Sequence, residues 1–189
     1  MGGAVDLEGS NDPRANELER RIVLSQYLTA IQCSGSIPPQ ETGLTVNSWY
    51  GKFHLEMHWW HAAHFALWNR LPLFERSLGW YEKIIPQARE LARSQGYQGA
   101  RWPKMVGPEG RDSPSPIGPL LIWQQPHPIF YAELCYLSHA NRATLNRYAD
   151  LRAAAPERRY EAVILLGRRH GPRNIVRVAG GLHDPNQFI

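Results

Sequence analysis

The side chains best suited to chemistry gather in one short stretch, His54-Leu55-Glu56-Met57-His58-Trp59. Two imidazoles and a carboxylate can bind hydroxyl groups or hold a water molecule, and a tryptophan face can pack against a sugar ring. Burial among aromatic residues would raise the pKa of Glu56 and give it acid or base character. A hydrogen-bonded or solvent-facing helix carboxylate is an equally good interpretation, so we assign Glu56 to ligand binding rather than catalysis.

The histidines of this stretch have the spacing of a metal site, because imidazoles one helical turn apart point the same way. They are His54, His58, His61 and His64. In the metalloprotease motif HExxH, however, Glu directly follows the first His, whereas here the order is His-Leu-Glu-Met-His. We therefore expect no metal and no other cofactor. His54 and His58 are predicted to face sugar hydroxyls or water, and His61 and His64 to lie in the core or between helices.

Two further clusters couple an aromatic face to a donor fork or an amide, which suits neighbouring sugar hydroxyls held over a ring. They contain Arg101, Trp102, Trp123, Gln124 and Gln125. Gln124 and Gln125 directly precede a proline-initiated helix, which predicts a place on the rim of the domain. A structural role is an equal alternative for both clusters. Lys52 and Glu41, in or beside a long loop, are weaker candidates.

The elements that must position these side chains are predicted to be helices. Apolar residues recur at near-helical spacing in five segments, 12–32, 54–68, 72–93, 126–137 and 141–151. Pro86 should kink or divide the third segment. Two loops rich in Gly and Pro, 33–53 and 99–119, are expected on the same rim, and loops of this length often carry function. We expect no strand before residue 160.

Composition limits the class of protein and its partners. With 43% hydrophobic and 20% charged residues the chain is typical of a globular domain, and no apolar run has the length of a membrane span. The net charge of +4 comes from a late arginine-rich segment, so we expect neither nucleic-acid nor membrane partners. An RNA-binding helical protein is an alternative that depends on that segment alone.

Redox state and localisation are predicted from the two cysteines and the start of the chain. Cys33 and Cys135 are far apart and outside any CxxC spacing, which favours two buried thiols over a disulfide or a zinc site. Residues 1–11 are small and acidic rather than basic and then apolar, so they do not form a signal sequence. We expect the chain as written to be cytoplasmic.

One segment, Leu18 to Ala63, resembles the opening helices of the catalytic barrel in the inverting α-L-fucosidase and α-galactosidase type of glycoside hydrolase. Within it, the run from Lys52 to Trp60, KFHLEMHWW, looks like that family's Asn-Ile-Asn-Leu-Gln-Met-Asn-Tyr-Trp-like motif. The likeness continues through Leu73-Phe74, through GARWP at residues 99–103, through LIWQQ at residues 121–125 and through the helix that contains Glu133. The resemblance implies an all-α fold, a partial (α/α)6 toroid of the six-hairpin glycosidase type.

In this scheme residues 12–151 form a partial catalytic domain. Residues 1–11 form a disordered N-terminal segment, and residues 152–189 form an atypical basic tail that suggests a frame-shifted or truncated reading frame. An open half-toroid also leaves apolar helix faces uncovered, so we expect self-association through them.

The resemblance implies a carbohydrate substrate and single-displacement, inverting hydrolysis. The family's water-positioning asparagines fall on Lys52 and His54, a third motif asparagine falls on His58, and a motif glutamine falls on Glu56. The family's acid is a Glu in a Ser-Pro-Glu-Asn-like loop, which this sequence lacks. We therefore expect His54 to position water and the chain alone to bind sugar with little or no turnover. A noncatalytic carbohydrate-binding or helical interaction module is the alternative.

Overall fold

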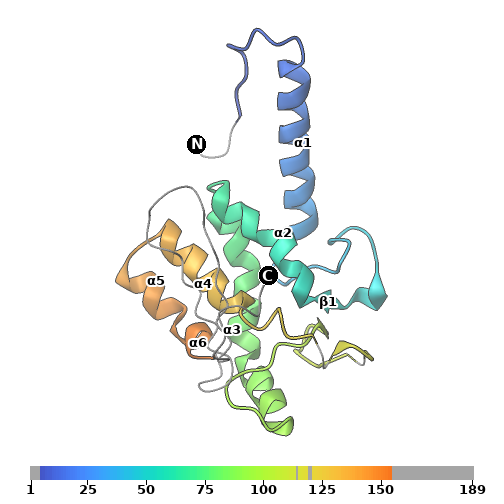
Figure 1. Cartoon of the computed structure of the whole chain (residues 1–189), viewed down its shortest axis with the longest axis vertical. Coiled ribbons are helices and arrows are strands. Elements are labelled where there is room, and N and C mark those ends of the chain that lie inside the picture. The colour runs from blue at the N-terminus through green and yellow to red at the C-terminus, as the bar shows by residue number, and fades with distance from the viewer. Residues whose placement is uncertain (1–4, 114, 119–120, 155–189) are drawn as a thin grey trace, which may run out of the picture.

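The computed structural model describes residues 5–113, 115–118 and 121–154 (Figure 1). These residues are mostly helical, which confirms the predicted all-α class. The helices are α1 (Ala15–Cys33), α2 (Leu55–Leu67), α3 (Leu71–Ser94), α4 (His127–Ser138), α5 (Arg142–Arg147) and α6 (Ala149–Ala153). The described elements also include a short 3-10 turn, η1 (Trp49–Gly51), and two short strands, β1 (Phe53–His54) and β2 (Met105–Val106).

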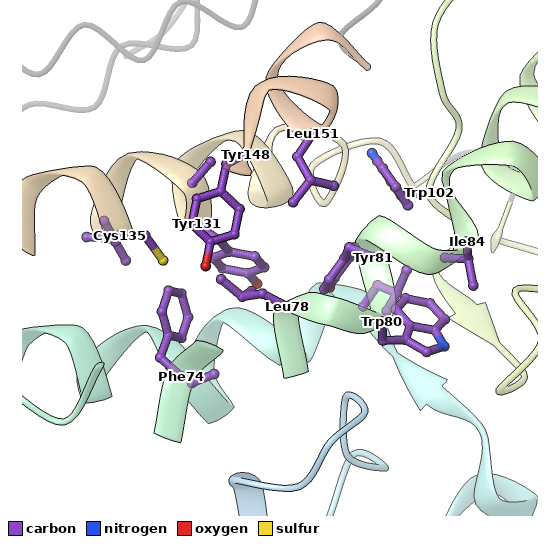
Figure 2. Close-up of a cluster of buried hydrophobic side chains, with 14 of the residues drawn as sticks. Phe74, Leu78, Trp80, Tyr81, Ile84, Trp102, Tyr131, Cys135, Tyr148 and Leu151 are labelled. Atoms are coloured by element: carbon purple, nitrogen blue, oxygen red, sulfur yellow. The ribbon is translucent and has the colours of Figure 1, made fainter. Parts of the chain in front are cut away.

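Helices α2, α3 and α4 pack against one another, and α6 packs on α3 and α4. The core lies between them, and Figure 2 shows its largest side chains. Phe74 and Tyr81 of α3 meet Tyr131 of α4 edge to face, with ring centroids 5.5 and 5.9 Å apart. Each such side chain contributes about 1.5–3 kcal/mol through burial. These three aromatic side chains therefore stabilise the fold, and none of them is available to a ligand.

Helix α3 is continuous from Leu71 to Ser94 with Pro86 inside it, so Pro86 does not divide this segment, which was one of the two effects predicted for it. An interior proline costs about 3 kcal/mol because it removes a backbone hydrogen bond and crowds the preceding turn. Buried side chains lie on both sides of Pro86, among them Ile85 and Ala88, and pack into the same core. Their burial offsets the cost of the proline.

The two predicted loops meet at the β1–β2 pair, which is antiparallel with Phe53 opposite Val106 and His54 opposite Met105. An additional bond runs from the Leu55 N–H to the Lys104 carbonyl, at 2.9 Å. The expectation that no strand precedes residue 160 is wrong here, because two-residue strands are too short to show an alternating pattern. This strand pair, which we call the β1–β2 clasp, joins the start of α2 to the loop that follows α3.

The helix predicted for 141–151 is in fact two short helices, α5 and α6, with Tyr148 between them. The Asn141 side chain caps α5 by accepting a hydrogen bond from the Thr144 N–H at 3.0 Å. Tyr148 is buried, and its hydroxyl donates to Glu75 of α3 at 2.8 Å. Anchoring of Tyr148 gives a reason for the break in the helix.

Helix α1 extends away from the α2–α4 body (Figure 1). Of its 19 residues only Ala15 and Cys33 are buried. Before it, the Leu7 N–H donates to Glu19 at 2.9 Å. No helix among the described residues combines the length and apolarity needed to cross a membrane. Residues 1–4 of the predicted disordered segment, and residues 155–189 of the predicted basic tail, lie outside the described residues.

Candidate functional site

Five polar and aromatic residues meet where the β1–β2 pair leads into α2, and we call them the Glu56 cluster: Glu41, Trp49, His54, Glu56 and Lys104. His54 ends β1 and stands at the N-cap position of α2, and Glu56 lies in the first turn of that helix. A carboxylate at this position is stabilised by the positive end of the helix dipole. Lys104 directly precedes β2, so the strand pairing brings it to His54 and Glu56.

The charged groups of the Glu56 cluster are close and largely shielded from water. The Lys104 Nζ lies 3.3 Å from Glu56 Oε1. The His54 Nδ1 lies 3.6 Å from Glu56 Oε1 and equally far from Glu41 Oε2. The side chains of His54 and Glu56 are only 2% and 7% exposed. These interactions therefore take place in a low-dielectric environment, in which they are stronger than at the surface.

The environment of Glu56 keeps its carboxylate charged. Burial alone would raise its pKa, but the His54 imidazole, the backbone N–H of Glu56 and the Lys104 ammonium together outweigh burial and leave the pKa below its ordinary value. Burial does raise the pKa of Glu56, as expected, but the net change is a lowering, chiefly because of the interaction with His54 and to a smaller extent because of Lys104. At neutral pH Glu56 can accept hydrogen bonds and cannot serve as a proton donor.

Two buried polar atoms of the cluster, Glu56 Oε2 and His54 Nε2, make no hydrogen bond to the protein. An unsatisfied buried polar group costs about 1–3 kcal/mol. Because His54 Nδ1 faces two carboxylates, we assign the ring proton to that nitrogen, which leaves Nε2 as an acceptor in the neutral imidazole. Both atoms can then accept a hydrogen bond, and because each is buried, a water molecule or a ligand hydroxyl would have to enter the cluster to reach it.

Trp49 adds an exposed aromatic face to this polar pair. Its ring centroid lies 5.5 Å from that of His54, and Lys104 Nζ lies 5.9 Å from the Trp49 centroid. Trp49 and Tyr50 have φ values of 49° and 59°, and Gly51 follows at 76°. Left-handed backbone at two non-glycine residues costs of the order of 1–3 kcal/mol each, and such strain tends to cluster at functional sites. The turn presents Trp49 to solvent with 55% of its surface exposed.

The structure places His58 in the core, so we leave it out of the proposed binding site. Its Nδ1 lies 2.9 Å from the Tyr81 hydroxyl, and its Nε2 lies 3.0 Å from Ser77 Oγ. Complete burial lowers the pKa of His58 to about 3, with smaller contributions from neighbouring imidazoles, so the ring is neutral. The sequence spacing placed His58 one helical turn after His54. In the structure, however, the His58 side chain points towards α3.

Trp102 and the two glutamines form a structural unit. Trp102 is 2% exposed and packs against Tyr81 at 5.3 Å (Figure 2). The Gln125 side chain accepts from the Trp102 N–H at 2.8 Å and donates to its carbonyl at 2.6 Å. Gln124 donates to the same carbonyl at 3.2 Å and to the Leu121 carbonyl at 2.9 Å. These bonds join the loop before β2 to the start of α4. They support the structural role that was the alternative to ligand binding for Trp102, Gln124 and Gln125.

The remaining predicted site residues are spread over the molecule. Trp59 is half-buried between α2 and α4, 4.2 Å from the Phe130 ring centroid. Trp123 is 56% exposed, Lys52 is half-buried, and an Arg101 guanidinium nitrogen donates to the Leu121 carbonyl at 3.4 Å. Of the predicted residues, His54, Glu56 and the weaker candidate Glu41 come together in the Glu56 cluster.

The other histidines of α2 attach surrounding segments to that helix. His61 Nε2 lies 2.9 Å from the Glu41 carbonyl, which fixes the loop before η1 against α2. His64 stacks on Trp68 with ring centroids 4.3 Å apart. In the described ranges, no three or more His, Cys, Asp or Glu side chains come together as a metal site.

Two residues of the Glu56 cluster, Lys104 and Trp49, were not predicted as site residues from the sequence. A signal for Trp49 was present, because Trp49-Tyr50-Gly51 is an aromatic pair before a glycine inside a long loop. Lys104 follows the GARWP stretch but belongs to the site only through strand pairing, which the sequence did not indicate. Comparison of the chain with protein-family models, with curated proteins and with solved structures gave no match.

Proposed function

We propose that the chain binds a carbohydrate at the Glu56 cluster as part of a glycoside-hydrolase-like domain of partial (α/α)6 architecture. The observation that supports this best is the pair of buried, unpartnered atoms Glu56 Oε2 and His54 Nε2 beside the exposed face of Trp49. A sugar offers hydroxyl groups on its edge and apolar C–H groups on its face. A carboxylate, an imidazole and an indole in one place match both surfaces.

The charged Glu56 would accept a hydrogen bond from a sugar hydroxyl, with Lys104 balancing its charge. Charge-assisted bonds of this kind are about twice as strong as neutral ones. His54 Nε2, with its ring proton held at Nδ1 by Glu41 and Glu56, would accept from a second hydroxyl or from a water molecule. This is the water-positioning role that the family resemblance suggests for His54.

In the family's reaction, inversion at an α-linked sugar requires a carboxylic acid opposite this water to protonate the leaving oxygen. Glu56 does not fit that role, because its pKa is lowered rather than raised. The second candidate function is a noncatalytic carbohydrate-binding module, which needs only the hydroxyl-binding groups that meet in the Glu56 cluster. In both cases the Glu56 cluster is the sugar site, and the two differ in whether an acid is supplied.

Calorimetric titration of the chain with methyl α-fucoside, methyl α-galactoside and methyl α-glucoside tests the proposal. Glu56→Gln keeps the side chain's shape and removes its charge, and we expect it to weaken binding about 5- to 10-fold, because a hydrogen bond to a charged group contributes about 1–1.5 kcal/mol more than one to a neutral group. Trp49→Ala should weaken binding as well. Trp123→Ala is the matched control, since Trp123 is 56% exposed and Trp49 is 55% exposed. Absence of sugar binding by the unmodified chain, or equal binding by Glu56→Gln, would contradict the proposal.

A further inference from the structure

Helix α1 exposes an unusual amount of apolar surface. Six large apolar side chains along it are 42–60% exposed: Leu18, Val23, Leu24, Tyr27, Leu28 and Ile31. Five of them share one broad face of the helix, at the spacing i, i+1, i+4, i+5 and i+8: Val23, Leu24, Tyr27, Leu28 and Ile31. A broad apolar face of a helix is normally covered by other protein. In the described part of the chain, only α2, near the end of α1, gives it substantial contact with another helix.

The composition of α1 makes a covering partner more necessary. Isolated helices shorter than about 12–15 residues are marginal in water, and longer ones need strong helix formers. Ile22, Val23, Thr29 and Ile31 are β-branched and lose side-chain freedom in a helix. Helix α1 therefore depends on packing for its stability, and the α2–α4 body covers only one end of it.

A groove runs along the same surface. One hollow of about 490 Å³ lies between Val23 and Tyr27 of α1 and Phe65, Trp68 and Leu73 at the α2–α3 corner. A second hollow, of about 550 Å³, continues towards the start of α1 and shares Val23 and Tyr27 with the first. The two hollows form one continuous, largely apolar track that is suited to the side chains of another helix.

We propose that α1 pairs in antiparallel orientation with α1 of a second copy of this chain, about a two-fold axis near Leu24 and Ser25. The large apolar residues run from Leu18 to Ile31, and their midpoint lies at that position. A two-fold interface uses the same patch on both copies, so an apolar helix and an adjoining apolar groove complement each other.

The distribution of charge favours the antiparallel arrangement. The charged residues of α1 are all in its first half, Glu17, Glu19, Arg20 and Arg21, and the stretch from Ile22 to Cys33 has none. An antiparallel pair sets each charged half against an uncharged half. Glu17 already pairs with Arg20 and Arg21 within its own helix, at 2.7 and 2.8 Å. A parallel pair would instead place identical charges opposite one another.

The exposed area is adequate for a dimer of this kind. The six side chains expose about half of their surface, which amounts to roughly 500 Å² per copy on the scale of 150–250 Å² for a large side chain. A stable interface buries about 800 Å² per partner. The polar residues between the six side chains and the walls of the groove supply the difference.

Sedimentation of the full 189-residue chain over a range of concentrations tests the inference. We expect a dimer that dissociates on dilution, and we expect Leu24→Glu and Leu28→Glu to raise its Kd at least 100-fold. Leu137→Glu is the matched control, because Leu137 on α4 is 57% exposed and lies off α1, and it should leave Kd unchanged. Circular dichroism of each variant checks that the helices are retained.

Spin labels on single cysteines test the orientation independently, since both native thiols are buried. At 1.5 Å per residue, labels at Asn16 of two antiparallel copies are offset by about 25 Å along the axis, whereas labels at Ser25 are almost level. The Ser25 pair should therefore give the shorter distance. Equal distances would overturn the antiparallel arrangement. A chain that stays monomeric would overturn the proposal. Protection of α1 from hydrogen exchange in that monomer would show that another part of the chain covers the helix, and binding of lipid vesicles would show that a membrane surface covers it.

Discussion

The buried His58 predicts a specific loss of stability in mild acid. In the folded chain burial lowers the pKa of His58 to about 3, while an unfolded histidine titrates near 6.5. Between these values the unfolded state binds a proton that the folded state does not, so the free energy of unfolding falls as the pH falls below about 6.5. At pH 5 the loss from His58 is about 2 kcal/mol, from about 1.4 kcal/mol per pH unit. Burial also lowers the pKa of His127, to about 4, which acts in the same direction.

Urea denaturation at pH 7 and pH 5, followed by circular dichroism, measures this loss. His58→Gln keeps a partner for Tyr81 and Ser77 but cannot titrate, so its free energy of unfolding should fall about 2 kcal/mol less between the two pH values than that of the unmodified chain. His139→Gln, at an exposed histidine, is the control and should keep the full loss. Parallel pH profiles for the unmodified chain and His58→Gln would refute the argument.

Three further predictions follow from other parts of the molecule. Under the proposed function, the chain alone should bind aryl α-fucosides and α-galactosides but hydrolyse them at least 100-fold more slowly than a glycosidase with a positioned acid, because such an acid contributes about 10²–10⁴-fold; equal rates would show that the acid is already present. Burial raises the pKa of Cys33 to about 11 and of Cys135 to about 12, so both thiols should react with a disulfide reagent only after unfolding, and labelling of the native chain would contradict this. Gln125→Ala should lower the free energy of unfolding by about 1–3 kcal/mol, because it leaves the Trp102 N–H and carbonyl without that partner; a thermal melt measures the change, and an unaltered melting temperature would argue against the structural role.

Long amphipathic segments were predictable from the sequence. Phe74, Leu78 and Tyr81 recur at helical spacing, and the helix around them begins and ends within a residue or two of the predicted positions. Prediction failed where a long-range contact overrides the local pattern. Core packing around Pro86 keeps α3 whole, and the bond between Tyr148 and Glu75 fixes the break between α5 and α6.

The candidate site was predictable only in part for the same reason. His54 and Glu56 are only two residues apart in the sequence, so their proximity needed no knowledge of the fold. Lys104 reaches them through strand pairing across about fifty residues. The helical period placed His58 near the site as well, but the period does not tell which face of a helix meets α3 and which meets solvent. Trp102 was proposed because it neighbours a polar side chain, and that pattern does not tell a ligand-binding tryptophan from a buried one.

The β1–β2 clasp also has a consequence for the order of folding. Pairing of Phe53 with Val106 closes a loop that contains α2 and α3, and the entropy of that closure must be overcome before the strand bonds form. Helices α2 and α3 contact each other directly and can pair without the clasp. We therefore expect the helical hairpin to form early and the clasp late. Until the clasp closes, Glu56 lacks the ammonium of Lys104, so assembly of the charged site should coincide with the last step of folding.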